Sequence, residues 1–525
     1  MPPVLLSCFE RSLPLLDTAA HRRIEARSRD TDAALMARAG AAAAAWIGER
    51  LAAHGQRDSE ILVCVGPGNN GGDGLLSAAC LHRQGHSVRV LMPAAPCTAE
   101  ARAAHAEARA AGVPIATALA DDFDWQRPVL AVDALFGLGL SRALQGPFAA
   151  IAERLSARTR NAAAVLALDL PSGLDADTGR PVAHGPVVEA GATLSFIALK
   201  PGLFTGKGRD YTGQIHLAPL DLPDGAEQAP ADWRLNAPVE FLARLPRRNA
   251  SSHKGTFGSL AVVGGDTGTC GATLLCARAA LYAGAGRVHA ALLGAGAPAY
   301  DAPHPEIMLR AFDALDLDSM DALSVGAGMG QAEAGRRALD RVLAVEVPAV
   351  LDADALNLIA KDSAFAARVR QAGERLVLTP HPGEAARLLG CDTADIEAER
   401  RAALDALVHR FGATVVLKGA GTLIGAPSGA RLANPTGNAG LASGGTGDVL
   451  GGLIGAYLAQ GLAPRAAAAA AVFWHGLAAQ TLARAGTGPA GLSAGELAPE
   501  VRRLMNQALR TRDAGAPLLG AGPLY

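Results

Sequence analysis

Residues 60–92 read EILVCVGPGNNGGDGLLSAACLHRQGHSVRVLM, and this stretch decides the fold of the first half of the chain. Short β-branched runs flank a segment whose apolar residues recur at helical spacing, so the order strand, glycine loop, helix, strand predicts one βαβ unit. Further apolar runs at 128–133, 164–169 and 192–197 predict a mostly parallel sheet covered by helices on both faces. We expect functional side chains at the carboxyl ends of these strands.

A second series of strands follows a connection rich in proline and charge, residues 220–248, which lacks sustained periodicity. Strands that end in small or polar residues are expected within 258–265, 322–328, 348–357, 375–384 and 413–422. A chain of 525 residues exceeds what one hydrophobic core usually organises. We therefore expect two α/β domains with a connection and a short end segment: domain 1–225, linker 226–245, domain 246–510 and tail 511–525.

The composition narrows the class of partner. Hydrophobic residues make up 50% of the chain and charged residues 19%, with a formal net charge of -2, so there is no electrostatic reason to expect nucleic acid or an anionic membrane. The seven cysteines form no C-x-x-C pair, which argues against a zinc site or a disulfide framework. The N-terminus lacks a basic segment followed by an apolar core, and no later segment approaches an uninterrupted twenty-residue apolar span. We expect a soluble cytoplasmic protein with a small substrate.

The first glycine loop, GPGNNGGDG at 66–74, contains a literal G-x-G-x-x-G. A dinucleotide-binding Rossmann loop would need an acid at the end of the next strand, yet SVRVLMPAAP at 87–96 ends without Asp or Glu. A glycine-rich turn that merely joins strand to helix is the other alternative. Asn69, Asn70 and Asp73 supply more polar groups than such a turn requires.

Two more segments place an aspartate at a strand end before a glycine-bearing turn: VDALFGLGLSRALQGP at 132–147 and ALDLPSGLDADTG at 167–179. All three loops should converge at one edge of the sheet. In this order, NNGGDG, D-x-L-F-G-x-G-L and D-x-P-S-G-L-x-x-D-T-G resemble the NAD(P)H-hydrate epimerase family over roughly residues 15–220. That family interconverts the two epimers of nicotinamide cofactors that have been damaged by addition of water at ring carbon six.

This resemblance implies that the hydrate is contacted by the first two loops and one acid: Asn69, Asn70, Gly71, Gly72, Asp73, Gly137, Leu138, Gly139, Leu140, Ser141, Arg142, Ala143 and Asp169. It implies a potassium ion held by Asn70, Asp133 and Ser172, whose amide, carboxylate and hydroxyl oxygens suit a hard cation better than zinc. A turn-capping role is the alternative for Asp169, but the resemblance favours general acid/base work at the hydrated carbon. Asp175 and Asp177 are assigned to the turn itself. Lys200 is either a phosphate contact or a solvated side chain.

The second glycine loop, NPTGNAGLASGGTGDVLGGLIGAYLAQG at 434–461, runs straight into an apolar helix. Unpaired N–H groups at the positive end of a helix form a ready anion site, which suits phosphate. The alternative is that the glycines only permit close packing while Asp448 caps the first turn. The pattern is not Walker A, because no G-K-[ST] follows. We expect Asp448 to stay ionised at neutral pH because the dipole and the nearby N–H groups favour its charged form. One apolar face of the helix should be buried: Val449, Leu450, Leu453, Ile454, Tyr457 and Leu458.

This loop resembles the G-T-G-D anion hole of the ribokinase-like superfamily, in which the aspartate activates a hydroxyl for attack on a phosphoryl group. With HKGTFGSLAVVGG, GAGMG, LDADALN, TPHPGE and LKGAGT it is similar to the ADP-dependent NAD(P)H-hydrate dehydratase family over roughly residues 250–505. One departure is HGLAAQ at 475–480, where relatives often carry H-G-x-A-G-D. The resemblance implies a catalytic base, Asp448, and a water-mediated magnesium contact, Glu384. It implies hydrate contacts from Ala272, Gly330, His381 and Asp448, and nucleotide contacts from Lys418, Gly419, Ala420, Gly421, Thr422 and Gly447.

The whole chain therefore resembles the bifunctional NAD(P)H-hydrate repair enzymes. This implies a Rossmann-like three-layer α/β/α sandwich that epimerises the R and S hydrates, and a ribokinase-like α/β domain that dehydrates the S form with ADP, giving AMP and phosphate. The implied cofactors are ADP, Mg²⁺ and K⁺, and the implied substrates are NADH hydrate and NADPH hydrate, with no nucleic acid or membrane partner. We expect a homo-oligomer. The alternative function is a ribokinase-like kinase of a small molecule such as a vitamin precursor, with a non-catalytic N-terminal interaction domain.

Overall fold

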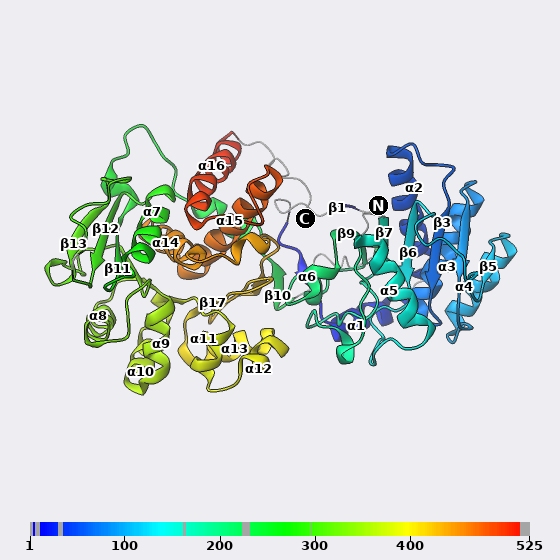
Figure 1. The fold of residues 1–525 in the computed structure, drawn as a ribbon, viewed down its shortest axis with the longest axis horizontal. Coiled ribbons are helices and arrows are strands. Elements are labelled where there is room, and N and C mark those ends of the chain that lie inside the picture. The colour runs from blue at the N-terminus through cyan, green and yellow to red at the C-terminus, as the bar shows by residue number, and fades with distance from the viewer. Residues whose placement is uncertain are drawn as a thin grey trace. The chain divides into compact units, whose positions relative to one another are not determined.

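The computed structural model describes residues 4–5, 11–29, 35–160, 164–222, 231–295 and 297–514. Among these residues the chain forms two compact units, divided between Trp233 and Arg234, and residues 11–12 also belong to the second unit. Each unit is an α/β domain built around one mainly parallel sheet (Figure 1). The predicted fold class is confirmed.

Unit 1 has a sheet of order β1-β9-β8-β7-β6-β3-β4-β5, in which the described neighbouring pairs are parallel except β1 with β9. The strands of this sheet are β1 (Val4–Leu5), β3 (Ile61–Val65), β4 (Val88–Leu91), β5 (Ile115–Ala116), β6 (Leu130–Ala134), β7 (Ala164–Leu168), β8 (Ala192–Phe196) and β9 (Gln214–Ala218). The short strand β2 (Pro14–Leu15) is not part of it. Its helices are α1 (Thr18–Arg29), α2 (Leu35–Ala53), α3 (Asn69–Arg83), α4 (Ala99–Ala110), α5 (Pro147–Arg160) and α6 (Gly208–Tyr211).

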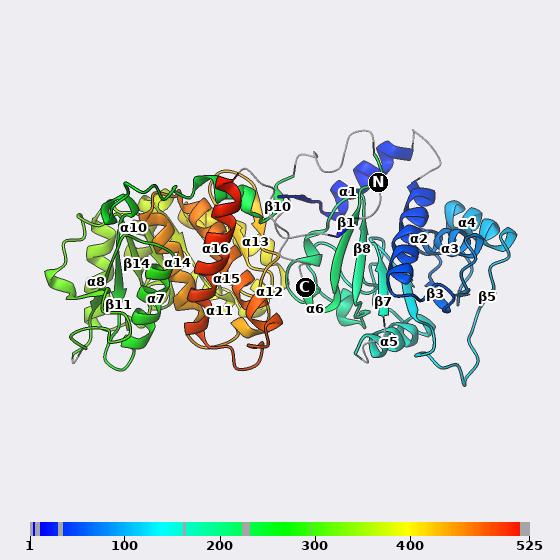
Figure 2. The same ribbon diagram turned by 90° about the horizontal axis from the view of Figure 1, so that it is seen from above.

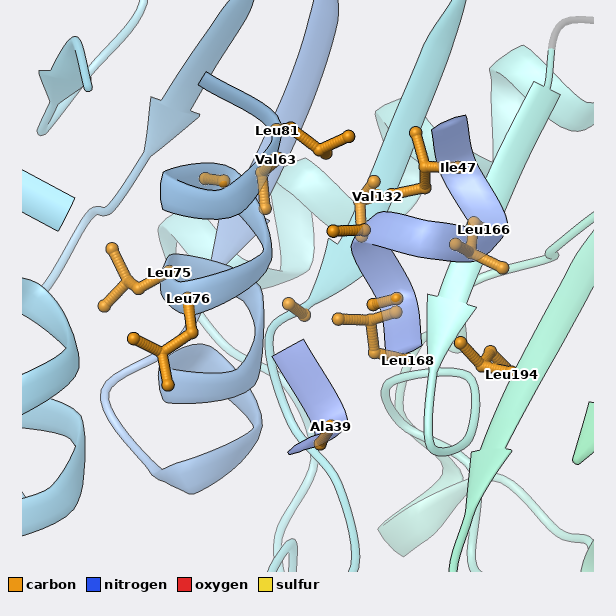
Figure 3. Packing of buried hydrophobic residues seen from close by; sticks show 14 of the residues in the cluster. Ala39, Ile47, Val63, Leu75, Leu76, Leu81, Val132, Leu166, Leu168 and Leu194 are labelled. Atoms are coloured by element: carbon orange, nitrogen blue, oxygen red, sulfur yellow. The ribbon is translucent and has the colours of Figure 1, made fainter. Parts of the chain in front are cut away.

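Alternate residues of the strands enter two different cores, one on each face of the sheet. Figure 3 shows Val63 and Val132 on the same side of the sheet as Ile47 of α2 and Leu81 of α3, within one cluster of buried side chains. Their strand neighbours, among them Leu62, belong to the cluster that includes α5. Figure 2 shows α5 and the pair α2 and α3 on opposite sides of the sheet. Strands buried on both faces are typical of a parallel sheet between two helical layers, as the continuous apolar runs predicted.

The chain reverses its direction of progress through this sheet at β3, which has β4 on one side and β6 on the other. Ligands of doubly wound sheets bind at such a switch point, outside the carboxyl ends of the strands. The loops that follow β3, β6 and β7 all begin at that edge. The topology therefore brings together the segments on which the epimerase resemblance depends.

Unit 2 has strands in the order β13-β12-β11-β14-β15-β16-β17-β18-β19-β10, parallel from β13 to β17 and antiparallel in β17–β18 and β18–β19. These strands are β10 (Trp233–Leu235), β11 (Ser259–Gly264), β12 (Arg287–Leu292), β13 (Met308–Ala311), β14 (Ala322–Val325), β15 (Ala349–Leu351), β16 (Leu376–Leu378), β17 (Thr414–Leu417), β18 (Leu423–Gly425) and β19 (Arg431–Ala433). The helices are α7 (Cys270–Tyr282), α8 (Glu333–Ala344), α9 (Ala353–Lys361), α10 (Ser363–Ala372), α11 (Pro382–Leu389), α12 (Thr393–Ala398), α13 (Arg400–Phe411), α14 (Thr446–Ala459), α15 (Pro464–Arg484) and α16 (Ala494–Asp513). Figure 1 shows α7, α14, α15 and α16 on one side of this sheet and α8 to α11 on the other.

Helix α15 is, within the described residues, the one helix long and apolar enough to cross a membrane by length and composition. Arg465, His475 and Gln480 interrupt its apolar residues, so it is not an uninterrupted twenty-residue apolar span of the kind considered in the sequence. Its most apolar 18 residues are 83% buried within the protein, which is typical of a core helix. Its side chains from Ala466 to Gln480 are buried in unit 2.

Part of the stretch for which we expected a linker, 226–245, is folded. Residues 223–230 lie outside the described part of the chain, but residues 234–245 belong to unit 2. Phe241 is fully buried, and its ring centroid lies 5.6 Å from that of Phe473 and 5.7 Å from that of Trp474. The segment packs through irregularly spaced aromatic and leucine residues, which leave no periodic pattern in the sequence. The predicted tail, 511–525, begins as the last turn of α16, and residues 515–525 are outside the described part.

Candidate active sites

Asp133 in β6 and Ser172 after β7 are joined at the carboxyl edge of the unit 1 sheet. Ser172 Oγ donates to Asp133 Oδ1 at 2.6 Å, and the Ser172 N–H donates to Oδ2 at 2.8 Å. Ser172 Oγ also accepts from the Phe136 N–H at 2.9 Å. Both side chains are fully buried. Burial raises the pKa of Asp133 to about 6, although the hydrogen bonds from Ser172 and Leu135 oppose the shift.

Asn70, in the first turn of α3, is buried, and neither its Oδ1 nor its Nδ2 has a hydrogen-bond partner in the described structure. Buried polar atoms without partners are rare, and a bound ion or ligand is one explanation. A Cβ at Gly137 would lie 3.5 Å from Asn70 Cγ and 3.5 Å from Asp169 Oδ2. The loops after β3, β6 and β7 therefore meet at one place, as their sequences predicted.

The glycines of the first loop have a packing role. A Cβ at Gly66 would lie 1.8 Å from the Leu135 carbonyl oxygen, and one at Gly71 would lie 1.9 Å from the Gly66 carbonyl oxygen. The loop can approach β6 only because these positions have no side chain. Asn69, in contrast with Asn70, accepts a hydrogen bond from Thr98 Oγ1 at 2.7 Å and so contacts the start of α4.

Asp169 adopts a φ of 69°, a left-handed backbone conformation that non-glycine residues rarely take. Its Oδ1 accepts from Lys200 Nζ and from the Phe196 N–H at 3.3 Å. Its Oδ2 faces Gly137, on the side of Asn70. Strain of this kind costs on the order of 1–3 kcal/mol and is concentrated at functional sites. Asp169 thus has one anchored oxygen and one that faces the meeting point of the three loops.

Lys200 has neither of the two roles that the sequence left open. Its side chain is fully buried, and Nζ donates to Asp169, to Ser195 Oγ at 3.0 Å and to the Phe196 carbonyl at 3.0 Å. An ammonium group has three N–H donors, and this geometry uses all three within the protein. Lys200 is therefore a partner of the site's acid.

His21 and Asp73 border this pair. Burial, helped by the nearby Lys200 charge, lowers the pKa of His21 to about 4, and its Nε2 lies 3.4 Å from the Ala198 carbonyl oxygen. Burial also raises the pKa of Asp73 well above its ordinary range, and the charge of Asp169 adds to this effect. The two carboxyl groups of the site lie in different environments, one beside a cation and one desolvated. A desolvated carboxyl group with a raised pKa is suited to donate a proton.

The other predicted hydrate contacts lie in the loop between β6 and α5. Gly139, Ser141 and Arg142 are exposed there, and Leu138, Leu140 and Ala143 are partly buried. Asp175 Oδ1 accepts from the Asp177 and Thr178 N–H groups at 3.1 and 2.8 Å, which confirms its assignment to the turn.

In unit 2, the glycine loop leads into α14 as predicted, and the six apolar residues named from the sequence are buried. The N-cap is Gly445, whose φ of 88° requires glycine, and no side chain caps this helix. Asp448 stands in the first turn without a capping bond, so the capping alternative fails.

The environment of Asp448 differs from our expectation. Burial raises the pKa of Asp448 to about 6, with further repulsion from Asp352 and partial relief from Lys418. Desolvation outweighs the helix dipole because the first turn lies against the core. A carboxyl group with this pKa is still about nine-tenths ionised at pH 7.

Lys418, directly after β17, lies between two acids. Its Nζ lies 2.7 Å from Asp352 Oδ1 and 3.8 Å from Glu384 Oε2. Burial alone would lower the pKa of Lys418, but Asp352 and Glu384 more than offset this effect and the pKa is raised. A Cβ at Gly447 would lie 3.7 Å from Lys418 Nζ and 3.9 Å from Asp352 Oδ2. This cluster therefore adjoins the positive end of α14.

The loop from Lys418 to Thr422 is shaped by two left-handed glycines, Gly419 with φ 128° and Gly421 with φ 62°. Buried Arg400 donates to the Lys418 carbonyl at 3.1 Å, and a Cβ at Gly419 would lie 2.9 Å from the Arg400 Nη1 atom. Thr422 Oγ1 donates to the Gly419 carbonyl at 3.2 Å. A tight turn of this kind can present successive backbone N–H groups to an anion.

The predicted hydrate contacts of unit 2 come from three elements at the same edge of the sheet. His381 caps α11 through Nδ1, which accepts from the Gly383 N–H at 3.0 Å, and its own N–H donates to Glu384 Oε2 at 2.8 Å. Gly330, with φ 71°, donates to Asp354 Oδ2 at 2.9 Å. Ala272 lies in the first turn of α7. A Cβ built on Gly328 would lie 3.2 Å from the Cβ of Ala272.

Two functional candidates were missed. Asp352 stands in the quoted LDADALN motif, where an acid directly after a strand was a usable signal. His475 of α15 is buried, which lowers its pKa to about 4, and its ring bonds to the backbone of Thr446 at the start of α14. Gln480, which stands where relatives often carry an acid, is also buried. Together, the two units define a two-domain α/β enzyme with an acid/base site in unit 1 and a phosphoryl-transfer site in unit 2.

Comparison with known proteins gives the same division. Residues 260–500 match the family model described as NAD(P)H-hydrate dehydratase, and residues 32–202 match the YjeF-related protein N-terminus. The chain belongs to the family of bifunctional NAD(P)H-hydrate repair enzymes. It is 42% identical to the bifunctional NAD(P)H-hydrate repair enzyme Nnr of Escherichia coli strain K12, with 85% of each chain covered. It is 37% identical to the Coxiella burnetii enzyme of the same name, which covers 92% of this chain and 97% of that protein.

Unit 2 has separate relatives. The ADP-dependent (S)-NAD(P)H-hydrate dehydratase of Neisseria meningitidis serogroup B is 46% identical over 277 residues, which are 52% of this chain and 93% of that protein. A solved Bacillus subtilis ADP/ATP-dependent NAD(P)H-hydrate dehydratase, co-crystallised with ATP/Mg²⁺, is 30% identical, with a TM-score of 0.43 over 51% of this chain and 94% of that one.

Proposed function

We propose that this protein repairs hydrated nicotinamide cofactors. Unit 1 interconverts the R and S epimers of NADH hydrate and NADPH hydrate, and unit 2 dehydrates the S epimer with ADP, yielding NAD(P)H, AMP and phosphate. The observation that carries the proposal is the position of Asp448, in the first turn of α14 and next to the Lys418–Asp352 pair. It is supported by relatives that are named as NAD(P)H-hydrate repair enzymes and as an ADP-dependent (S)-NAD(P)H-hydrate dehydratase.

The chemistry of unit 2 starts from a poor leaving group. Asp448 takes the proton of the C6 hydroxyl group. The hydroxyl oxygen attacks the terminal phosphorus of ADP at the same time, and AMP leaves. The N–H groups that lead into α14 stabilise the negative charge on the transferring group, and Lys418 adds a fixed positive charge beside them. The phosphorylated C6–O bond then breaks with assistance from the electron pair of the ring nitrogen. Phosphate leaves, and the neighbouring ring carbon loses a proton to complete the double bond.

In unit 1, inversion at C6 requires that one bond to this carbon breaks and forms again on the other face. A proton moves at the C6 hydroxyl in the process, and Asp169 Oδ2 is the carboxylate oxygen that faces the meeting point of the loops. Asp73, whose pKa burial raises, is the group suited to return a proton.

Potassium fits unit 1. Asn70, Asp133 and Ser172 would hold it, and both the unpartnered buried amide of Asn70 and the raised pKa of Asp133 are features that a bound cation would relieve. When bound, the ion supplies positive charge beside an anionic substrate. In unit 2, Glu384 would orient magnesium through water, and the metal would neutralise nucleotide phosphate charge.

The decisive experiment incubates the full chain with a mixture of R and S hydrates, ADP and magnesium, followed by chromatography. We expect complete conversion of both epimers to NAD(P)H, and without ADP only exchange between epimers. Conversion of the S epimer alone would remove epimerisation from the proposal. A stable phosphorylated alcohol without a rise in absorbance at 340 nm would point to a small-molecule kinase instead. The cytoplasmic location and the homo-oligomer stay predictions.

A further inference from the structure

Lys200 occupies a position that the chemistry proposed for unit 1 does not yet explain. It follows β8, while Asp169 follows the neighbouring strand β7, and the Asp169 N–H donates to the Leu194 carbonyl at 2.8 Å. The pairing of these two strands therefore sets the position of both side chains. The turn from Ser195 to Lys200 contains a second left-handed residue, Ile197 with φ 66°, and folds back so that its own oxygens receive the ammonium group.

Stability alone is a poor reason for this arrangement. A lysine is almost never fully buried unless it is paired, and a buried ion pair often gains less from attraction than it loses by desolvation. Replacement of such a pair by apolar residues is often neutral or stabilising. The geometry has a different result: Lys200 and the Phe196 N–H fix Oδ1 of Asp169, while Oδ2 faces Gly137 and Asn70.

We propose that Lys200 is a positioning residue of the epimerase site, which fixes Asp169 Oδ1 so that Oδ2 meets the hydroxyl of the hydrated carbon. The proposal rests on the epimerisation proposed for unit 1 and adds to it a residue that acts through Asp169. Proton transfer needs heavy atoms within hydrogen-bond reach, and a misplacement of about 1 Å can cost about a hundredfold in rate. Three acceptors hold the ammonium group and leave it little freedom.

The test is Lys200→Met, which keeps the length of the side chain and removes the charge and donors. Lys207→Met is the matched control, since Lys207 is an exposed lysine in the next turn. R-to-S exchange is measured without ADP, and dehydration of purified S hydrate with ADP is measured on the same preparation. We expect kcat for exchange to fall by about tenfold to a hundredfold in Lys200→Met, with KM within about threefold of the original value. Lys207→Met should match the unmodified protein in both assays.

A double-mutant cycle separates positioning from a structural role. Asp169→Asn removes the group through which Lys200 acts, so Asp169→Asn with Lys200→Met should exchange no more slowly than Asp169→Asn alone. Additive losses, or wild-type exchange in a folded Lys200→Met protein, would overturn the proposal.

Ser195→Ala supplies a milder perturbation if Lys200→Met expresses poorly. It removes one of the three acceptors of Nζ, and we expect a loss of about threefold to tenfold in exchange with unchanged dehydration. Wild-type exchange in Ser195→Ala combined with unfolding of Lys200→Met would assign the lysine a structural role and refute the proposal. Absence of exchange in the unmodified chain would refute epimerisation itself, and this inference with it.

Discussion

The substitution Asp448→Asn in α14 tests whether Asp448 acts as a base or only maintains the shape of its loop. The amide has the size of the carboxylate but cannot accept the hydroxyl proton. The main partners of Lys418 are Asp352 and Glu384, and Asp448 contributes less to its environment. The lysine and the N–H groups at the start of α14 should therefore stay in place in the variant, and the affinity for ADP should change by less than about threefold.

The magnitude follows from the role. A positioned general base contributes about a hundredfold to ten-thousandfold, so we expect dehydration of the S hydrate to fall by this amount. The pH profile gives an independent check. With a pKa of about 6, Asp448 is about one-tenth ionised at pH 5, so kcat/KM of the unmodified enzyme should fall about tenfold per pH unit below pH 6. The acidic limb should be absent in Asp448→Asn.

The assay records ADP-dependent recovery of absorbance at 340 nm, ADP binding by calorimetry and epimer exchange on one preparation. Glu333→Gln is the control, because Glu333 is an exposed acid in the first turn of α8. Dehydration at a rate close to normal in Asp448→Asn would remove this residue from the mechanism. Simultaneous loss of ADP binding would show that it shapes the loop instead.

Three further predictions concern other parts of the chain. Gly447→Ala should raise KM for ADP about tenfold, because the added Cβ would lie beside Lys418. It should not lower the melting temperature, because that Cβ makes no close contact with the protein. Gly495→Ala in α16 is the control. Potassium should raise the melting temperature of unit 1 by about 2–4 °C relative to tetramethylammonium at pH 7.5, and by less at pH 5. The reason is the raised pKa of Asp133: above pH 6 its buried carboxylate is ionised and opposes folding unless a cation is bound. Equal melting temperatures in the two salts at pH 7.5 would contradict the potassium site. A cut near Pro230, which lies outside the described residues, should leave two pieces that each keep their own activity, and an insoluble first piece beside a soluble second one would count against the boundary.

The sequence predicted the parts of both sites that follow from strand ends. Asn70, Asp133 and Asp169 stand at or shortly after the ends of apolar runs, and parallel strands bring such positions to one edge. Asp448 was predicted in another way, from the glycine loop that leads into an apolar helix. Lys200 could not be predicted in the same way. A lysine after a strand is usually solvated, and its burial here depends on the register of β7 with β8 and on the backbone conformation of Asp169.

Two features could not be predicted for a common reason, which is that burial is a property of the folded chain. The dipole of α14 is visible in the sequence, but the desolvation that raises the pKa of Asp448 comes from elements far away along the chain. The proline-rich segment around Phe241 has no pattern, yet it is buried because α15 offers aromatic partners.

The backbone of helix α14 packs directly against other backbone segments at two places. A Cβ at Gly452 would lie 2.1 Å from the Cys276 carbonyl oxygen of α7, and one at Gly258 would lie 1.9 Å from the Ala459 carbonyl oxygen at the far end of α14. Backbone thus approaches backbone closely at both places, and neither glycine could be replaced without moving the helix. Asp448 lies one turn from the first of these places, about 6 Å along the axis. A side chain added at Gly452 would therefore displace the base from one turn away, without touching the substrate.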